Sequence, residues 1–517
     1  MSWSYTRRLI YGSLITPWKY FDFHMISVTL IILIGVWLAK VILEWRNRRI
    51  RLIEFSKKLP GPPTLPLIGN ALAFACSSTE TLNVVTSLCN YGPIFRVWMG
   101  PKLFVAITDP RDYEVILTSP KASHKGAFYR FMKPFIGEGL VSGSGPTHRT
   151  HRKIIMPMLN VRVLEVFIQY FNEHSKYCAN QLEEMVDTGE FDILPFTAHC
   201  AADITLETVM GIPGTVQRGG YKQLMHWAER MYEVIHTRIM KVWLHPEWIY
   251  SWTEYRAQEK IGQNVIQGFT ESAIERKKKE HYALERGALI SNRPRTMILE
   301  QLITYVENTH VMNDEELRDE IYTVFTAAQD TTGLVSAFAL LLLGMHSDTQ
   351  DKVRAELKDV VGTKDITMEM IPELKYLEMV IKETLRLFPI APMFVRELTG
   401  DVELESCTLP KGCSVAMVPF VTHRSPKYWM EPEKFIPERF LPENSQNRHH
   451  YSFVPFSAGT RSCIGQKYAI MSMKIIIGTI VRKYQITAKG SMETIRLKTD
   501  ISVRSVDGYK VSITRTT

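Results

Sequence analysis

The 517-residue sequence has few cysteines, and no two of them form a CxxC pair. Its seven cysteines are odd in number and widely scattered, which argues against a disulfide framework and a structural zinc site and suits a reducing compartment. The sequence also lacks an internal repeat and a low-complexity linker that would divide residues 70–517. It lacks a GxGxxG motif that opens a helix after a strand, so any nicotinamide or flavin cofactor belongs to a separate protein.

The sequence also lacks a strong excess of positive or negative charge. The formal net charge is +8, and the Lys and Arg residues are spread along the chain apart from small clusters at 46–51 and 276–279. Such clusters are usually solvated helix faces, so we expect no nucleic-acid partner. With 45% hydrophobic and 22% charged residues, the chain is not disordered and can bury a large core.

The N-terminal region predicts a membrane anchor. Residues 25–39 carry no charge, and apolar character resumes after Lys40, which gives enough length to span a bilayer. A buried core helix is the alternative, although the segment precedes any domain-like sequence. We therefore expect a transmembrane helix over residues 23–43 after a short lumenal segment, 1–22. Basic residues are more numerous after the helix, which places the rest of the protein on the cytosolic side.

The following segment, residues 44–70, is basic and then proline-rich (KKLPGPPTLPLIGN), which favours an extended, stiff connector. Residues 71–517 read as one catalytic domain that is mainly α with a minor β part. Helical patterns cover 161–186 and 348–361. The strand candidates are 94–100, 102–109, 413–420 and 509–516.

One cysteine stands in a distinctive setting, FSAGTRSCIGQKYAI. Glycines beside Cys463 permit tight turns, and amide N–H groups at the start of a helix stabilise a thiolate. The residues alone therefore predict a reactive nucleophile or a metal ligand here.

The spacing Phe456, Gly459, Arg461, Cys463, Gly465 resembles in full the FxxGxRxCxG haem loop of the cytochromes P450. The resemblance implies the P450 fold and a haem b (iron protoporphyrin IX) whose iron takes the Cys463 thiolate as axial ligand. Softer similarity, in DITLETVMG (203–211) and RIMKVWLHPEWIY (238–250), points to the branch with fatty-acid ω-hydroxylases and related insect microsomal enzymes.

Two further motifs agree with this resemblance. Glu383 and Arg386 form an ExxR pair on one helix face, and EPEKFIPERF supplies Arg439. In the family these three residues form a structural network that braces the haem side of the fold. An ExxR pair alone is weak evidence, but the order of the three motifs makes the match specific.

The resemblance also implies which residues bind the haem propionates. These are Arg461, Arg396, Arg152 and His148, where His148 stands at a position usually occupied by Trp. A histidine can still donate an N–H to a carboxylate. Exposed basic surface is the alternative for His148 and His151, and a zinc site on them is disfavoured because no further ligands stand nearby.

The polar stretch TAAQDTT interrupts an apolar helical pattern and matches the family's oxygen-activating motif. The resemblance assigns proton delivery to Asp330 and Thr331, an acid beside an alcohol. A threonine hydroxyl can also bond back to the carbonyl one turn earlier and bend the helix. The alternative is that the threonine only caps local backbone groups while Asp330 forms a salt bridge.

Small residues mark this chain off from its best-understood relatives. Ala328 replaces the usual glycine, and Ala327 stands where many ω-hydroxylases carry a glutamate that forms an ester to the haem. We therefore expect a non-covalently bound haem and a relaxed regioselectivity. Phe325, Ala327, Ala328 and Phe394 are the expected substrate-pocket residues.

The sequence thus predicts a membrane-anchored, cytosol-facing monooxygenase of the endoplasmic reticulum. It would insert one oxygen atom from O2 into a lipophilic substrate such as a fatty acid, a hormone or terpenoid, or a xenobiotic. NADPH would act through a cytochrome P450 reductase, with cytochrome b5 as an optional second donor; Arg448 and Lys467 are docking candidates, or simply solvated charges. The alternatives are a haem-thiolate isomerase or dehydratase that uses no O2, and a non-catalytic haem protein.

Overall fold

The computed structural model describes residues 16–286 and 296–516, with side chains from Ser27 onward. The chain divides into two units, Met1–Leu59 and Pro60–Thr517. Residues 1–15 of the expected lumenal segment lie outside the described residues.

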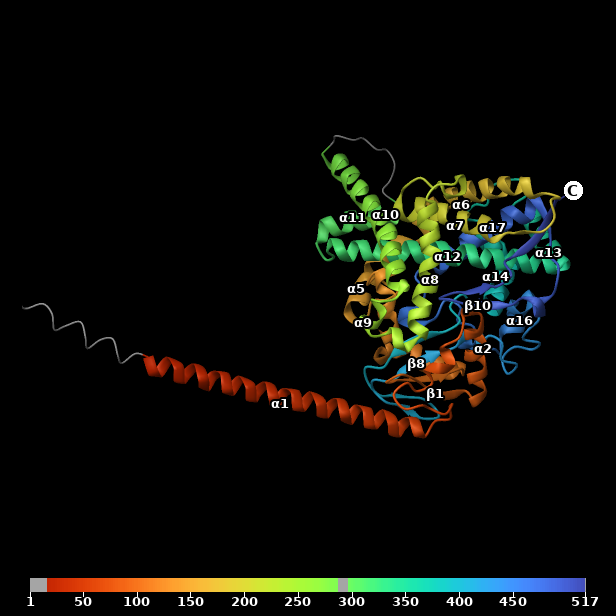
Figure 1. The fold of residues 1–517 in the computed structure, drawn as a ribbon. Coiled ribbons are helices and arrows are strands. Elements are labelled where there is room, and N and C mark those ends of the chain that lie inside the picture. The colour runs from red at the N-terminus through yellow and green to blue at the C-terminus, as the bar shows by residue number, and fades with distance from the viewer. Residues whose placement is uncertain (1–15, 287–295, 517) are drawn as a thin grey trace, which may run out of the picture. The chain divides into compact units, whose positions relative to one another are not determined.

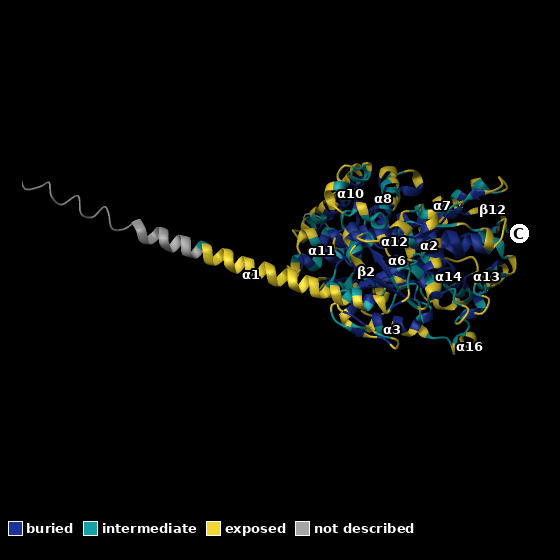
Figure 2. Cartoon of the chain, turned by 60° about the horizontal axis from the view of Figure 1, so that its bottom comes forward, coloured by how far each residue is buried: buried dark blue, intermediate teal, exposed yellow. Residues whose placement is uncertain are grey.

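The first unit contains α1 (Thr16–Lys57), a single continuous helix. Its part from Ser27 to Lys57 has a mean hydropathy of 2.1 over its most apolar window and is long enough to cross a membrane, and none of that window is buried in the protein. Figure 2 shows most of the described part of this helix in yellow, the colour of exposed residues. The helix continues past the anchor expected at 23–43 because residues 44–57 contain neither proline nor glycine.

The proline-rich stretch that follows is part of the second unit and not a free connector. The Arg96 N–H donates to the Pro60 carbonyl at 2.9 Å. Gly69 has φ +63°, and a Cβ there would lie 2.4 Å from the Trp98 carbonyl oxygen, so only glycine fits against this strand. These contacts assign residues 60–70 to the second structural unit, which begins at Pro60.

The second unit is mainly helical (Figure 1). Its α-helices are α2 (Ser78–Leu88), α3 (Pro110–Thr118), α4 (Lys133–Ile136), α5 (Gly145–Ile155), α6 (Val161–Gln181), α7 (Leu194–Thr205), α8 (Lys222–Met240), α9 (Glu247–Tyr250), α10 (Glu254–Glu285), α11 (Ile298–Thr309), α12 (Asp314–Met345), α13 (Ser347–Val360), α14 (Lys375–Leu387), α15 (Pro419–Thr422), α16 (Pro442–Ser445) and α17 (Gln466–Lys483).

The strands of the described residues are short and lie in four small sheets. They are β1 (Ile94–Met99), β2 (Lys102–Ile107), β3 (His124–Lys125), β4 (Phe191–Asp192), β5 (Phe394–Glu397), β6 (Val402–Glu403), β7 (Thr408–Leu409), β8 (Ser414–Met417), β9 (Tyr484–Thr487), β10 (Leu497–Thr499), β11 (Val503–Ser505) and β12 (Lys510–Arg515). The largest sheet has the order β1-β2-β8-β5-β3, in which β2 and β8 are parallel and the other pairs antiparallel.

The predicted elements are confirmed. The four expected strands appear as β1, β2, β8 and β12, and the two helical patterns as α6 and α13, each within a few residues of the expected bounds. In α6, α13 and β12 the buried positions follow the helical or strand period, whereas β2 and β8 are short apolar runs that are buried on both faces and β1 is buried over most of its length.

Helix α12 passes through the middle of the domain with α7 and α17 packed along it (Figure 1). By length and hydropathy α12 could also span a bilayer, but 72% of its apolar window is buried inside the protein. Its hydrophobicity therefore reflects its place in the core, shown in dark blue in Figure 2.

Candidate functional site

The polar stretch TAAQDTT lies inside α12 without breaking it. The Thr331 hydroxyl donates to the Ala327 carbonyl one turn earlier at 2.9 Å, as expected from the sequence. Ala327 is exposed although Thr326 and Gln329 beside it are buried. One face of α12 is therefore accessible at Ala327.

Asp330 is held by the C-terminal part of the chain. Its Oδ2 accepts a hydrogen bond from the Ser502 hydroxyl at 3.0 Å, and its Oδ1 pairs with the Arg504 guanidinium in β11. The salt bridge that the sequence left as an alternative is thus present. Arg504 was not expected from the sequence, because an arginine between Val503 and Ser505 in a three-residue strand does not indicate a buried acidic partner.

The loop before α17 presents Cys463. The Cys463 N–H donates to the Phe456 carbonyl at 2.8 Å, and the Ser462 N–H donates to the Gly459 carbonyl at 3.1 Å. Gly459 has φ +68°, and a Cβ there would lie 2.0 Å from the Leu117 carbonyl oxygen. The loop can therefore close against the end of α3 only with glycine at this position.

The Cys463 thiol is desolvated by the protein around it, yet the residue is accessible. The sulfur is therefore surrounded by protein on most sides but remains open to a ligand on one side. Burial raises the pKa of this thiol, while the Gly465 N–H and the Arg152 guanidinium lower it. The helix-terminus effect expected from the sequence is present but smaller than desolvation, and a bound metal would deprotonate the thiol.

A cluster of cationic side chains gathers beside this loop. The Arg461 Nε and Nη2 donate to the Ser123 and Gly143 carbonyls at 2.9 and 2.6 Å, but its Nη1 is buried with no hydrogen-bond partner. Arg396 is buried in β5. Arg152 donates to the Ser462 carbonyl and hydroxyl at 2.6 and 3.0 Å.

Lys125 is a member of this cluster that the sequence analysis missed. Burial and the nearby Arg396 and Arg461 lower its pKa well below the usual value. Among the described residues, no carboxylate lies within 4.0 Å of a nitrogen of Lys125 or of the three arginines. Several buried cations without an anion predict an anionic ligand. A lysine in a two-residue strand gives no such signal in the sequence.

His148 lies in the same cluster and is buried, as is His151, so neither is the exposed basic surface considered above. Burial, together with Arg461 and Arg152, lowers the pKa of His148 to about 3. The imidazole is therefore neutral at physiological pH and can donate one N–H. Among the described residues no group of three or more His, Cys, Asp or Glu side chains could hold a metal ion.

The Glu383, Arg386 and Arg439 network is formed as expected. Arg386 binds both carboxylate oxygens of Glu383 at 2.7 and 2.8 Å, and the Arg439 Nε donates to Glu383 Oε1 at 3.2 Å. The Arg386 guanidinium also donates to the carbonyls of His423, Pro432 and Lys434. All three side chains are buried, so the network fixes α14 against the loop that leads to Cys463.

The expected pocket residues do not share one environment. Ala327 is exposed and Ala328 partly buried, whereas Phe394 is buried in β5. Phe325 is only 1% exposed, and its ring centroid lies 6.1 Å from that of Phe269 in α10. Side chains two positions apart in an α-helix point to nearly opposite sides. Phe325 therefore lies in the core, away from the accessible face at Ala327.

The two docking candidates also differ. Arg448 donates to the Arg439 carbonyl at 2.9 Å and lies 4.0 Å from the Trp429 ring, so it serves the fold. Lys467 is exposed at the start of α17.

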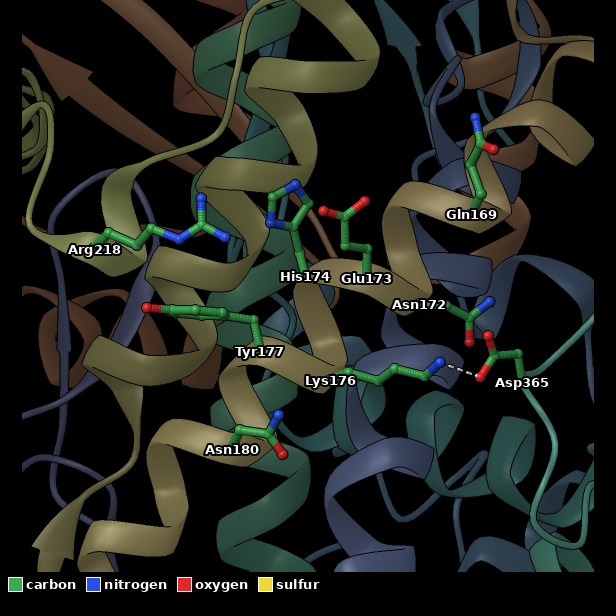
Figure 3. A pocket seen from close by; sticks show the side chains of 9 residues that line it. All are labelled: Gln169, Asn172, Glu173, His174, Lys176, Tyr177, Asn180, Arg218 and Asp365. Carbon is green, nitrogen blue, oxygen red and sulfur yellow. Dashed lines mark ion pairs between the residues drawn. The ribbon is translucent and has the colours of Figure 1, made fainter.

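A separate pocket of about 390 Å³ lies along α6 (Figure 3). It is lined by polar side chains, and Lys176 and Asp365 in it pair at 2.5 Å. None of the expected haem or oxygen residues lines it.

A family model described as "Cytochrome P450" matches residues 59–513. The chain belongs to the cytochrome P450 family. It is 35% identical to mouse "Cytochrome P450 4V2", a match that covers 87% of this chain and 88% of the relative. It is 31% identical to "Cytochrome P450 4g15" of Drosophila melanogaster over 91% of this chain and 94% of the relative. The P450 match begins one residue before the second structural unit, which starts at Pro60.

The site fits the haem-thiolate cofactor that P450 enzymes bind. Cys463 is accessible as an iron ligand, and the space beside Gly465 is open, because a Cβ there would meet no atom within 4 Å. The cation cluster lacks an anion, and the two haem carboxylates would supply one. The chain is therefore a P450 monooxygenase, an iron-dependent oxidoreductase, and its relatives lie in the branch that the sequence resembled.

Proposed function

We propose that this P450 inserts one oxygen atom from O2 into a lipophilic substrate at the cytosolic face of the endoplasmic reticulum membrane. The observation that carries the proposal is the accessible thiol of Cys463 in a P450 loop, together with the accessible face of α12 at Ala327. Haem supplies the oxygen-activating chemistry when bound. The remaining roles fall to side chains of this chain.

Binding and orientation of the haem fall to the cation cluster. Arg461, Arg396, Arg152 and Lys125 would neutralise the propionates, and His148 would donate an N–H as a neutral imidazole. The unpartnered Nη1 of Arg461 supports this role. The haem is held non-covalently, because Ala327 has no carboxylate with which to form an ester.

Proton delivery falls to Asp330 and Thr331. Thr331 carries its hydroxyl on the accessible side of α12, and Arg504 and Ser502 fix the carboxylate of Asp330. A fixed acid and alcohol in a water-poor pocket deliver protons in an ordered way, which limits the release of peroxide. The same two contacts would also be present if Thr331 and Asp330 had only a structural role. Proton delivery by these residues is therefore a prediction that the experiment below tests.

Electrons would come from NADPH through a separate reductase, with cytochrome b5 as an optional donor. No dinucleotide-binding fingerprint is present in the sequence, which supports a separate protein. Lys467 is exposed near the thiolate loop and is a candidate contact for an acidic redox partner.

Contact with lipid is supported by apolar surface beyond α1. Trp243, Trp248 and Trp252 in the connection between α8 and α10 are exposed, and Trp252 is 88% exposed. Tryptophan is enriched where proteins meet the membrane interface. A lipid-facing catalytic domain suits a substrate that partitions into the bilayer.

The proposal is tested by spectroscopy and turnover of the full-length protein with purified reductase. The reduced, CO-bound protein should show the red-shifted band of a haem thiolate, and C463A should lose it. With a substrate found by spectral-shift titration of fatty acids, terpenoids and toxins, T331A should make several-fold less product per NADPH and more peroxide. Product formed without NADPH and O2 would favour an isomerase, no product from any spectrally bound ligand would favour a non-catalytic haem protein, and unchanged product and peroxide in T331A would refute the role of Thr331.

A further inference from the structure

A buried acid–base pair joins α5 to α12 and has no role in the mechanism above. The Nδ1 of His151 lies 2.7 Å from Oε1 of Glu320, and the two residues are 4% and 1% exposed. The second oxygen of Glu320 accepts the Leu140 N–H at 3.1 Å. On the other side of the imidazole ring, the Nε2 of His151 lies 3.7 Å from Oε1 of Glu316, whose side chain is 37% exposed.

The pair is held together by its own electrostatics. Burial lowers the pKa of His151, but the hydrogen bond and charge of Glu320 outweigh it, and the net pKa is raised. Burial raises the pKa of Glu320 against the effect of His151 and the Leu140 N–H. A buried ion pair is weak evidence for stability, because desolvation offsets the attraction. A role in fixing geometry is then the better explanation of its presence.

On the α5 side, the pair is linked to the thiolate loop. His151 is followed directly by Arg152, whose guanidinium donates to both the carbonyl and the hydroxyl of Ser462, the residue before Cys463. A displacement of α5 would therefore be passed to the backbone that carries the iron ligand.

On the α12 side, the pair is linked to the accessible face. Ala327 and Thr331 follow Glu320 by seven and eleven residues, which are close to two and three full turns of an α-helix. The three residues therefore share one face. Among the described residues, every hydrogen bond and ion pair between α5 and α12 involves His151.

We propose that His151 and Glu320 are positioning residues that hold the accessible face of α12 in register with the Cys463 loop. Through this register they set how much of the electron supply ends in product and how much in peroxide. The second statement rests on the proposed monooxygenase function. The first does not, because the state of the thiolate ligand can be read without turnover.

The test compares four variants of the full-length holoprotein. H151L and E320L each break the pair, H151L/E320L replaces it with apolar side chains, and E320Q keeps one hydrogen bond. The matched control is K277M, which breaks a buried ion pair between α10 and α11, where Lys277 lies 3.1 Å from Glu300. The readouts are the decay of the red-shifted CO band to the thiol-type band, the thermal midpoint, and peroxide formed per NADPH with reductase and lauric acid as the probe.

We expect full haem loading in every variant. In H151L, E320L and the double variant the CO band should decay several-fold faster than in the wild type, and peroxide per NADPH should rise two- to fivefold. E320Q and K277M should stay within about 1.5-fold of the wild type. The double variant should regain thermal stability but not the wild-type decay rate or peroxide yield.

Two results would overturn the proposal. One is a wild-type decay rate in both single leucine variants. The other is a decay rate that follows the thermal midpoint across all variants, K277M included, because the pair would then act only on stability. If the decay differs as expected but no variant, wild type included, turns over NADPH, the positioning role stands and the monooxygenase function fails.

Discussion

Replacement of Gly459 by alanine should damage the thiolate loop in a way that the structure allows us to estimate. At φ +68° a non-glycine residue costs about 1–2 kcal/mol of folding free energy. A Cβ here would also lie 2.0 Å from the Leu117 carbonyl oxygen, where real contacts stay above 3.0 Å. Relief requires the loop to move by about 1 Å, and such overpacking adds about 1–3 kcal/mol.

Gly412 offers a matched control. Its φ is +87°, but a Cβ there meets no atom within 4 Å. G412A should therefore lower the free energy of unfolding by about 1 kcal/mol, from strain alone, and G459A by about 3 kcal/mol.

The assay is urea unfolding of the holoprotein combined with the CO-bound spectrum. G459A should also lose a large part of its red-shifted band, because the displaced segment hydrogen-bonds to the turn that presents Cys463. Equal stability of G459A and G412A, together with a full thiolate band in G459A, would refute the reasoning.

Three further outcomes follow from the geometry. E383Q should destabilise the protein by about 3–5 kcal/mol, seen in thermal unfolding, because Arg386 is left buried without a counter-charge. Burial and the nearby arginines lower the pKa of His423 to about 3, and its Nε2 accepts the Val454 N–H. The unfolded chain therefore binds more protons below pH 6.5, and between pH 6.5 and 5 the wild type should lose about 2 kcal/mol more unfolding free energy than H423Q. Acidified organic solvent should extract free haem b from the wild type, whereas A327E should retain a covalently attached fraction.

The structure changes how two expected site residues are understood. His148 is a neutral, buried imidazole among arginines and a lysine, so it does not introduce a titration near physiological pH. Asp330 is not a free acid on the helix but a carboxylate fixed by Ser502 and Arg504. Ser502 and strand β11 therefore fix the carboxylate to which we assign proton delivery in the proposed function.

Local pattern was sufficient for the elements with strong periodicity. Helices α6 and α13 follow from helical spacing and strand β12 from alternation, whereas strands β1, β2 and β8 follow from short, mostly apolar runs that the core buries. Helix α1 runs on past residue 43 to Lys57, because polar residues do not end a helix, whereas proline does.

The sequence by itself determined the haem-thiolate chemistry, because Phe456, Gly459, Arg461, Cys463 and Gly465 lie within ten residues and their spacing is a local property. Only the tertiary structure decided which distant charges meet. Arg504 reaches Asp330 across 174 residues, and Lys125 joins Arg396 through the pairing of β3 with β5. These contacts come from the packing of helices and strands far apart in the chain, and no periodicity or spacing encodes them.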